Sequence, residues 1–205
     1  MKPELFFDLL SGQFDRQAGH FEESHTKTVE YTKKYLRTGD IILDYGCATG
    51  TVALEIADHV KEVHGIDISS RMITIAKRKA ADVNTEKLNF TQSTIFDERL
   101  KRGSFDVILV FNILHFLDDI PEVMRRINEL LKPGGFFISV TPCMGGTKTS
   151  PLIFQFLAKT GLLPPMKFFK ASELEHMMTN ENFCIVEIES LTPGSTNRFI
   201  VAKKV

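Results

Sequence analysis

The residues best suited to chemistry in this chain are a glycine-containing turn and an acidic side chain that follows it. The segment Ile41-Ile42-Leu43-Asp44-Tyr45-Gly46-Cys47-Ala48-Thr49-Gly50 predicts an apolar strand that leads through small residues into a helix. Its two glycines allow positive φ angles and let a ligand lie against the main chain. A second expected strand, Val63-His64-Gly65-Ile66, ends at Asp67. A carboxylate there is placed to accept hydrogen bonds from two ribose hydroxyls, so the pattern predicts a nucleoside-cofactor site.

The spacing of the small residues distinguishes between cofactors. A dinucleotide-binding site has the pattern G-x-G-x-x-G, which is absent from this turn. The turn instead resembles motif I of the class I S-adenosylmethionine-dependent methyltransferases, D-x-G-x-G-x-G, with Asp44, Gly46, Ala48 and Gly50 in register and Ala48 replacing the middle glycine. A second match is the turn Leu131-Lys132-Pro133-Gly134-Gly135 before an apolar strand. The matching segments run from Ile41 to about Val140 and are similar to small-molecule methyltransferases of the ubiquinone and menaquinone type.

The resemblance implies that S-adenosylmethionine binds across the carboxyl ends of the first four strands and leaves as S-adenosylhomocysteine. In that family the loop after the third strand brackets the adenine, usually through an acidic side chain, and Ser93 occupies that slot here. Asn112 is expected to face the methionine moiety, or else simply to form a turn. Cys47 fills a small-residue slot, where packing is the favoured role. The residues expected at the cofactor are Asp44, Gly46, Cys47, Ala48, Gly50, Asp67, Ile68, Ser93, Thr94, Ile95, Phe111 and Asn112.

The N-terminal segment matches a further pattern of the family. Many members start with F/W-D-x-x-A-x-x-F/Y, met here by Phe14-Asp15-Arg16-Gln17-Ala18-Gly19-His20-Phe21. The resemblance implies that residues 1–36 form a helical lid on the cofactor, with Phe21 in contact with it. The alternative is an amphipathic helix that packs on the domain without touching a ligand.

One histidine is a candidate catalytic residue. A methyl group on a sulfonium is already activated, so positioning does most of the work, and a base that removes the acceptor proton adds about 10²- to 10⁴-fold in rate. His115 follows the fourth expected strand and has an ordinary pKa near working pH. Its alternative role is to hydrogen-bond within its own loop. No metal site is expected.

The elements that must position these residues indicate an α/β fold. With the resemblance, they predict a doubly wound, mostly parallel seven-stranded sheet of the Rossmann-like methyltransferase type, with an antiparallel C-terminal hairpin. Ser69 or Ser70 is expected to cap a helix, and Ser172-Glu173-Leu174-Glu175 reads as a capping box. The later strands are expected at Leu88–Gln92, Phe105–Val110, Phe136–Val140, Phe183–Ile188 and Arg198–Ala202, with a helix at Pro121–Leu131.

The length of 205 residues suits a single domain, 1–205, in which residues 141–180 form a cap before the final hairpin. A net charge of −1 with interleaved signs does not favour nucleic acid as a partner. Three widely spaced cysteines suit a reducing compartment, and the apolar run at Leu5–Leu10 is too short for a signal peptide or a membrane span. These features predict a cytoplasmic protein with no membrane insertion, and they leave its oligomeric state open.

The sequence therefore predicts an S-adenosylmethionine-dependent methyltransferase that acts on a small, partly apolar acceptor at oxygen, nitrogen or carbon. Two alternatives stay open. One is a module that binds S-adenosylmethionine without catalysis. The other is a nicotinamide-dependent oxidoreductase, which the missing dinucleotide fingerprint and the lack of a Tyr-x-x-x-Lys pair disfavour.

Overall fold

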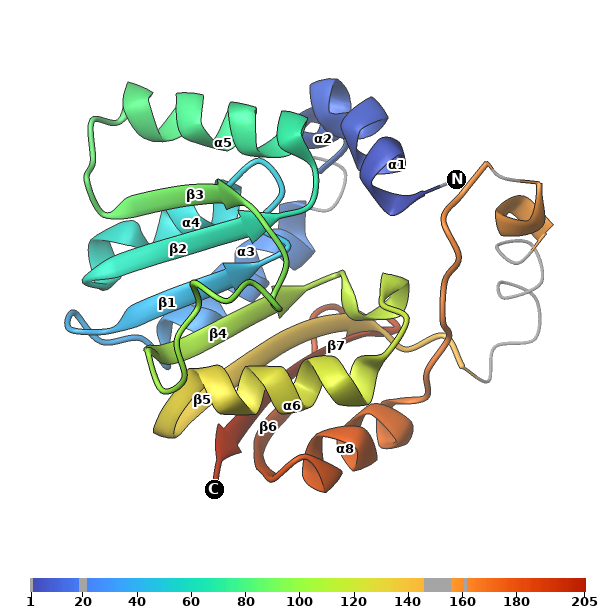
Figure 1. The fold of residues 1–205 in the computed structure, drawn as a ribbon. Helices are drawn as coiled ribbons and strands as arrows, with labels where there is room; N and C mark the ends of the chain where they lie inside the picture. The colour runs from blue at the N-terminus through green and yellow to red at the C-terminus, as the bar shows by residue number, and fades with distance from the viewer. Residues whose placement is uncertain (1, 19–21, 146–155, 161) are drawn as a thin grey trace.

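Seven strands form one mixed sheet in the computed structural model, which describes residues 2–18, 22–145, 156–160 and 162–205 (Figure 1). The strand order is β3-β2-β1-β4-β5-β7-β6, and β7 alone runs opposite to the other six strands. The strands are β1 (Ile41–Tyr45), β2 (Glu62–Asp67), β3 (Leu88–Gln92), β4 (Phe105–Phe111), β5 (Leu131–Pro142), β6 (Phe183–Ser190) and β7 (Asn197–Lys204). The expected fold class is confirmed.

Helices cover both faces of the sheet, as a parallel sheet requires. The helices α3 (Glu22–Lys33), α4 (Thr51–Ile56) and α5 (Ser70–Asp82) pack on one face around residues such as Ile42, Leu109 and Phe199. The helices α6 (Ile120–Leu130) and α8 (Ala171–Asn180) pack on the other face around Leu43 and Phe137. Alternation along each strand therefore divides the apolar side chains between two cores.

The first two helices, within residues 3–18, lie near the carboxyl ends of β1 to β3 (Figure 1). They are α1 (Pro3–Leu10) and α2 (Phe14–Ala18), with the 3₁₀ turn η1 (Ser11–Gln13) between them. Two further 3₁₀ turns, η3 (Ala57–His59) and η4 (Leu114–Phe116), follow α4 and β4. None of the helices within the described ranges is long and apolar enough to cross a membrane.

Two features of the sheet differ from the sequence expectation. Leu131 pairs with Phe105 and so already belongs to β5, and the strand then bulges before Phe136 pairs with Val107. The expected final hairpin does form, but β7 inserts between β5 and β6, so that β6 is the edge strand. Both differences arise because the pairing partner, which local sequence does not specify, decides where a strand starts and lies.

The expected capping box at Ser172 is wrong. The helix α8 starts at Ala171, and the Glu173 carboxylate accepts the N–H of Lys170 at 3.0 Å. Ser172 lies inside the first turn, so its hydroxyl cannot serve as the N-cap acceptor. By contrast, Ser69 is the N-cap of α5 as expected, and its hydroxyl accepts the N–H of Met72 at 3.1 Å.

Candidate functional site

The glycine turn between β1 and α4 is built from left-handed residues. Gly46, Ala48 and Gly50 have φ angles of 78°, 47° and 75°. A Cβ at Gly46 would lie 2.6 Å from Cγ2 of Ile113, so this position needs glycine for space as well as for conformation. Ala48 adopts a conformation that costs an L-residue about 1 kcal/mol or more, and such strain clusters at ligand sites. The turn thus carries stored strain at the position where the family motif has glycine.

Asp67 faces this turn from the end of β2. Its Oδ2 accepts the N–H of Ala48 at 3.0 Å and its Oδ1 accepts the N–H of Ser69 at 2.8 Å. Burial raises the pKa of Asp67, and these two N–H groups partly offset that effect. Each carboxylate oxygen keeps a further lone pair, so the side chain is fixed in place and can still accept two hydrogen bonds. This is the geometry that a ribose diol requires.

Asp44 is the second buried carboxyl group at the turn. It is 3 % exposed, and its Oδ2 makes no hydrogen bond to any described residue. Burial, together with the nearby charge of Asp67, raises the pKa of Asp44 to about 7. An unpartnered buried acceptor costs about 1–3 kcal/mol, which a cationic or hydrogen-donating ligand would recover. Cys47 is also buried, and its burial beside Asp44 and Asp67 raises the pKa of its thiol, which favours the packing role.

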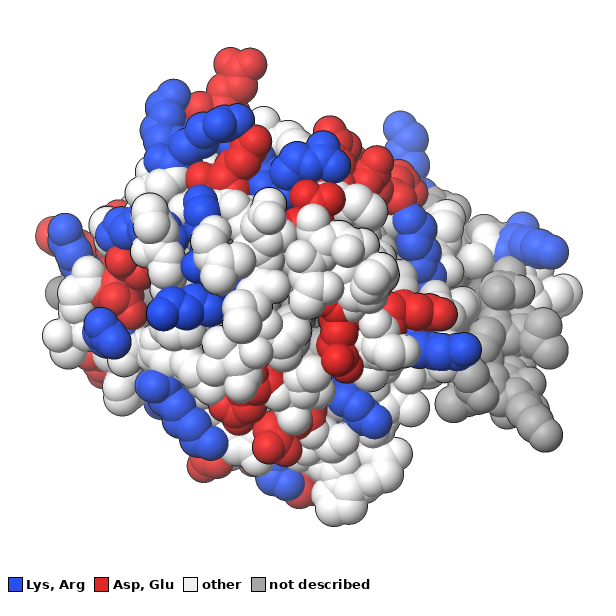
Figure 2. Space-filling model, turned by 90° about the horizontal axis from the view of Figure 1, so that it is seen from below, with Lys and Arg blue, Asp and Glu red and all other residues white. Residues whose placement is uncertain are grey.

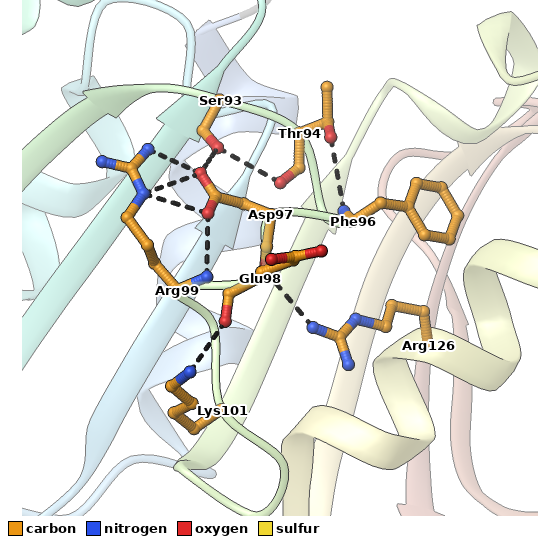
Figure 3. Close-up of polar contacts among 8 residues, drawn as sticks. All are labelled: Ser93, Thr94, Phe96, Asp97, Glu98, Arg99, Lys101 and Arg126. Atoms are coloured by element: carbon orange, nitrogen blue, oxygen red, sulfur yellow. Dashed lines mark hydrogen bonds and ion pairs between the residues drawn. The ribbon is translucent and has the colours of Figure 1, made fainter.

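The loop after β3 has its own carboxylate. The hydroxyl of Ser93 donates to Oδ2 of Asp97 at 2.5 Å, and the guanidinium of Arg99 holds the same carboxylate (Figure 3). Hydrogen bonds from Arg99, and secondarily from Ser93, lower the pKa of Asp97. Thr94 accepts the N–H of Phe96 at 3.3 Å and is exposed. The acid that is missing at position 93 is therefore present four residues later, attached to Ser93 by a hydrogen bond.

Arg126 of α6 fixes the same loop from below (Figure 3). Its guanidinium donates to the carbonyl oxygens of Ile95, Asp97 and Leu100 at 3.2, 3.4 and 2.9 Å. The side chain of Ile95 is fully buried in the core under α6, so only its backbone could reach a ligand. Three carbonyl contacts from one planar donor give the loop a defined shape.

The segment after β4 lies beside the glycine turn through Ile113. Asn112 is exposed, has a φ of 57° and donates its N–H to the Val140 carbonyl at 2.8 Å, so the backbone bends at this residue directly after β4. His115 lies in η4, is 5 % exposed, and its Nδ1 has no hydrogen-bond partner among the described residues. Burial lowers the pKa of His115 to about 4. Its ring lies 4.1 Å from that of Phe116, which contacts Phe7 of α1 edge-on.

Two aspartates join the N-terminal helices to this site. Asp8 of α1 accepts the hydroxyl of Ser69 at 2.5 Å and the N–H of Arg71 at 3.2 Å, directly beside Asp67. Asp15 of α2 accepts the hydroxyl of Thr49 at 2.5 Å. These contacts hold α1 and α2 against the start of α5 and the glycine turn.

A lysine of α5 completes the attachment of α2. Lys79 pairs with Asp15 at 2.7 Å and donates to Thr49 and Thr51 at 3.2 and 3.0 Å. The sequence reasoning missed Asp8, Asp15, Lys79 and Thr49. For Asp15 a signal existed, because it is the acidic position of the N-terminal motif.

The structure brings most of the expected site residues to one rim. Asp44, Cys47, Ala48 and Asp67 are neighbours, and Ser93 joins them through its N–H, which donates to the Asp67 carbonyl at 2.9 Å. Ile68 and Phe111 are half-buried at the ends of β2 and β4. Phe21, the lid contact, lies outside the described residues. A hollow of about 450 Å³ between the end of α5 and the start of β3 lies at the opposite edge of the sheet and is not part of this rim.

Comparison with known proteins identifies the family. The family model for a methyltransferase domain matches residues 36–194. The demethylmenaquinone methyltransferase of Lactococcus lactis is 32% identical over 183 residues, covering 77% of this chain and 71% of the relative. Phosphoethanolamine N-methyltransferase 2 of Caenorhabditis elegans is 25% identical over 158 residues, covering 77% of this chain and 35% of the relative.

Solved structures share the fold. Geranyl diphosphate C-methyltransferase from Streptomyces coelicolor, solved with Mg²⁺, geranyl diphosphate and S-adenosylhomocysteine, has a TM-score of 0.75 at 16% identity, covering 88% of this chain and 79% of that chain. Together with the left-handed turn and the buried Asp67, the family match makes S-adenosylmethionine the cofactor. The chain belongs to the methyltransferase domain family and is an S-adenosylmethionine-dependent methyltransferase.

Proposed function

We propose that this methyltransferase acts on a small, partly apolar molecule, at a rim made by the glycine turn, Asp67 and η4. The observation that carries the proposal is the pair of buried carboxyl groups, Asp44 and Asp67, beside a left-handed turn. S-adenosylmethionine carries a ribose diol, a sulfonium and an amino acid tail that ends in an ammonium and a carboxylate. Each Asp67 oxygen keeps one lone pair that can accept from the diol, and Asp44 has an unpartnered Oδ2 suited to the ammonium group.

His115 is the proposed base. Bound S-adenosylmethionine supplies a methyl group on a positively charged sulfur. Holding the acceptor in line with that methyl group contributes about 7–11 kcal/mol, so the residues that shape the rim matter more than any single base. The buried imidazole of His115 is neutral at physiological pH and can take the proton that the acceptor atom loses.

The small-molecule acceptor is supported by the surroundings of His115. The rings of Phe116 and Phe7 extend from His115 to α1 and offer an apolar wall. Acidic and basic side chains are interspersed on the face seen in Figure 2, and the net charge is −1, which is unlike the basic surface that nucleic acid requires. The similarity to a demethylmenaquinone methyltransferase agrees with an acceptor of partly apolar character.

Residues 1–36 form a lid in this proposal, and residues 141–180 form the cap on the acceptor side. The contacts of Asp8 with Ser69 and of Asp15 with Thr49 support the lid, because they attach α1 and α2 to the two elements that flank Asp67. The three cysteines are free, which accords with the proposed cytoplasmic location.

Calorimetry with S-adenosylmethionine, S-adenosylhomocysteine and NAD tests the site. We expect the two sulfur compounds to bind and NAD not to bind. Asp67→Ala and Asp67→Asn should weaken S-adenosylhomocysteine binding by about 10- to 100-fold, the range for hydrogen bonds to a charged group. Asp82→Ala, at the exposed far end of α5, is the matched control and should leave binding unchanged. Unchanged affinity in both Asp67 variants would contradict the proposed site.

A further inference from the structure

Three buried polar atoms on the acceptor side of the sheet have no hydrogen-bond partner among the described residues. They are Nδ1 of His115, Oγ of Ser139 and Oγ1 of Thr141. Ser139 and Thr141 are fully buried and His115 is 5 % exposed. Buried polar groups in native proteins are nearly always paired, so a cluster of unpaired ones requires an explanation. The fourth such atom, Oδ2 of Asp44, belongs to the cofactor side described above.

The two hydroxyls lie on one face of the sheet, and the turn that carries His115 packs on the same face. Ser139 and Thr141 stand two and four residues after Phe137 in β5. Side chains at every second position of a strand share a face, so both lie on the face of Phe137, under α6 and α8. Leu114 of η4 packs in the same core as Phe137, so η4 lies on that face too. The N–H of Asn112 donates to the Val140 carbonyl, so the segment that leads from β4 into η4 starts beside Ser139 and Thr141, and η4 itself contacts β5.

The segment 167–169 lies beside η4 and beside the residues that follow β5. The N–H of Lys167 donates to the His115 carbonyl at 2.7 Å. The N–H of Gly145 donates to the Phe169 carbonyl at 2.7 Å, and Phe169 packs in the same core. Both contacts are backbone hydrogen bonds. None of the described side chains of these segments supplies a partner to the three polar atoms.

The cluster carries no charge. Burial is the cause of the lowered pKa of His115, and it keeps the imidazole neutral near pH 7. Arg198 of β7 pairs with Thr141 across the sheet, but its guanidinium donates to the carbonyls of Ser195 and Asn197. The Lys167 ammonium donates to the Asp118 carbonyl. The described residues do not contain a group of three side chains suited to a metal ion. A phosphate or an ammonium placed here would lose its water without gaining a counter-charge.

We propose that His115, Ser139 and Thr141 form a subsite for an uncharged hydroxyl, enol or carbonyl head group of the methyl acceptor. This inference rests on the proposed function, because it places the acceptor at the same rim. The two hydroxyls can donate or accept, and the neutral imidazole can accept at one ring nitrogen, so the three together match a group that both donates and accepts. Acceptors whose head group is a phosphate, a diphosphate or an ammonium are excluded.

Matched compounds test the head group. The probes are 2-naphthol, 2-naphthyl phosphate and 2-naphthylmethylamine, with phenol, phenyl phosphate and benzylamine as a smaller series. Binding of each is measured by calorimetry to the protein saturated with S-adenosylhomocysteine. We expect at least one uncharged phenol to bind, and its phosphate and amine counterparts to bind at least tenfold more weakly. Equal or tighter binding of a charged counterpart, or no binding by either phenol, would overturn the proposal.

Variants test the residues. Thr141→Val and Ser139→Ala should weaken phenol binding at least fivefold each, whereas Thr141→Ser, which keeps the hydroxyl, should stay within twofold of the parent. Because the hydroxyls are unpaired in the free protein, Thr141→Val should keep or raise the melting temperature, which a structural hydroxyl would not allow. If the Ser139→Ala, Thr141→Val double variant binds the phenol as tightly as the parent, the proposed subsite is wrong. S-adenosylhomocysteine affinity, read separately, reports on the proposed function and should not change.

Discussion

At the residue scale, two buried groups with opposite pKa shifts define the chemistry of the rim. Asp44 has a pKa raised to about 7, because burial and the charge of Asp67 disfavour its ionised form. His115 has a pKa lowered to about 4, because burial disfavours the imidazolium. Near neutral pH, His115 is therefore uncharged and Asp44 is divided between its ionised and its protonated form. A cationic ligand beside Asp44 would favour the ionised form.

These shifts predict opposing effects of pH on stability. Between about pH 4 and 6.5 the unfolded chain binds a proton at His115 that the folded chain does not, so this residue destabilises the fold as pH falls, by up to about 3 kcal/mol. Between about pH 3.8 and 7 the folded chain keeps a proton on Asp44 that the unfolded chain loses, so this residue destabilises the fold as pH rises, by up to about 4 kcal/mol.

Urea unfolding at pH 4.5, 5.5 and 7 measures the two effects separately. Relative to the parent, Asp44→Asn should gain stability as pH rises, because the opposing effect of Asp44 is gone. His115→Gln should lose stability relative to the parent over the same range. Exposed Asp82→Asn and His59→Gln serve as controls. A free energy of unfolding whose pH dependence is the same in all five proteins would refute the assigned shifts.

At the element scale, α1 and α2 are attached to the site by a few polar contacts rather than by a large core. None of the residues in α1 is buried, and Leu5 and Leu9 are 57% and 68% exposed. Partial burial acts to raise the pKa of Asp15, but hydrogen bonds from Lys79 and Thr49 outweigh it and lower the pKa overall. The carboxylates of Asp8 and Asp15, together with the edge-on contact of Phe7 with Phe116, hold these helices.

Removing these contacts should loosen α1 and α2 selectively. Asp8→Asn with Asp15→Asn should raise amide hydrogen exchange over residues 3–18 by about fivefold or more while lowering global stability by only about 1 kcal/mol, since surface ion pairs contribute little. If the lid proposal holds, S-adenosylhomocysteine should also dissociate faster. Lys27→Gln, which breaks the exposed pair with Glu23 on α3, is the control and should change neither quantity. Unchanged exchange in the double variant would show that other contacts hold the segment.

At the scale of the whole molecule, β5 and β7 connect the two cores. Phe137 of β5 lies in the core under α6 and α8, and Phe199 of β7 lies in the core under α3, α4 and α5. Both side chains are fully buried, and their strands are paired along seven residues. A cavity in either core therefore destabilises the same pair of strands, β5 and β7.

Two core substitutions test this coupling. Phe137→Ala and Phe199→Ala should each cost about 3–5 kcal/mol of unfolding free energy, the usual range for a buried phenylalanine. In both variants, far-ultraviolet circular dichroism and tyrosine fluorescence should report one shared transition, because the sheet belongs to both cores. Ile188→Ala, on the edge strand and 37% exposed, is the milder control. Separate transitions for the two probes would show that the two faces unfold independently.

Much of this protein follows from the sequence alone. The strand, turn and helix at 41 to 56, the acidic end of β2, and the apolar run of β4 each carry a local pattern, because backbone conformation and hydrophobic periodicity act over a few residues. Motif spacing located Asp44, Gly46 and Asp67, and also predicted the fold class and the cofactor.

Tertiary structure decided what those patterns could not. The bond between Asp8 and Ser69, the link from Ser93 to Asp97, and the insertion of β7 between β5 and β6 all depend on which distant segments meet. So do the unpaired atoms of His115, Ser139 and Thr141, since a hydroxyl on a strand looks the same in sequence whether or not a partner reaches it. Local sequence determines the backbone conformation of each element. Burial, ion pairs and long-range hydrogen bonds form only when distant segments pack together in the folded chain.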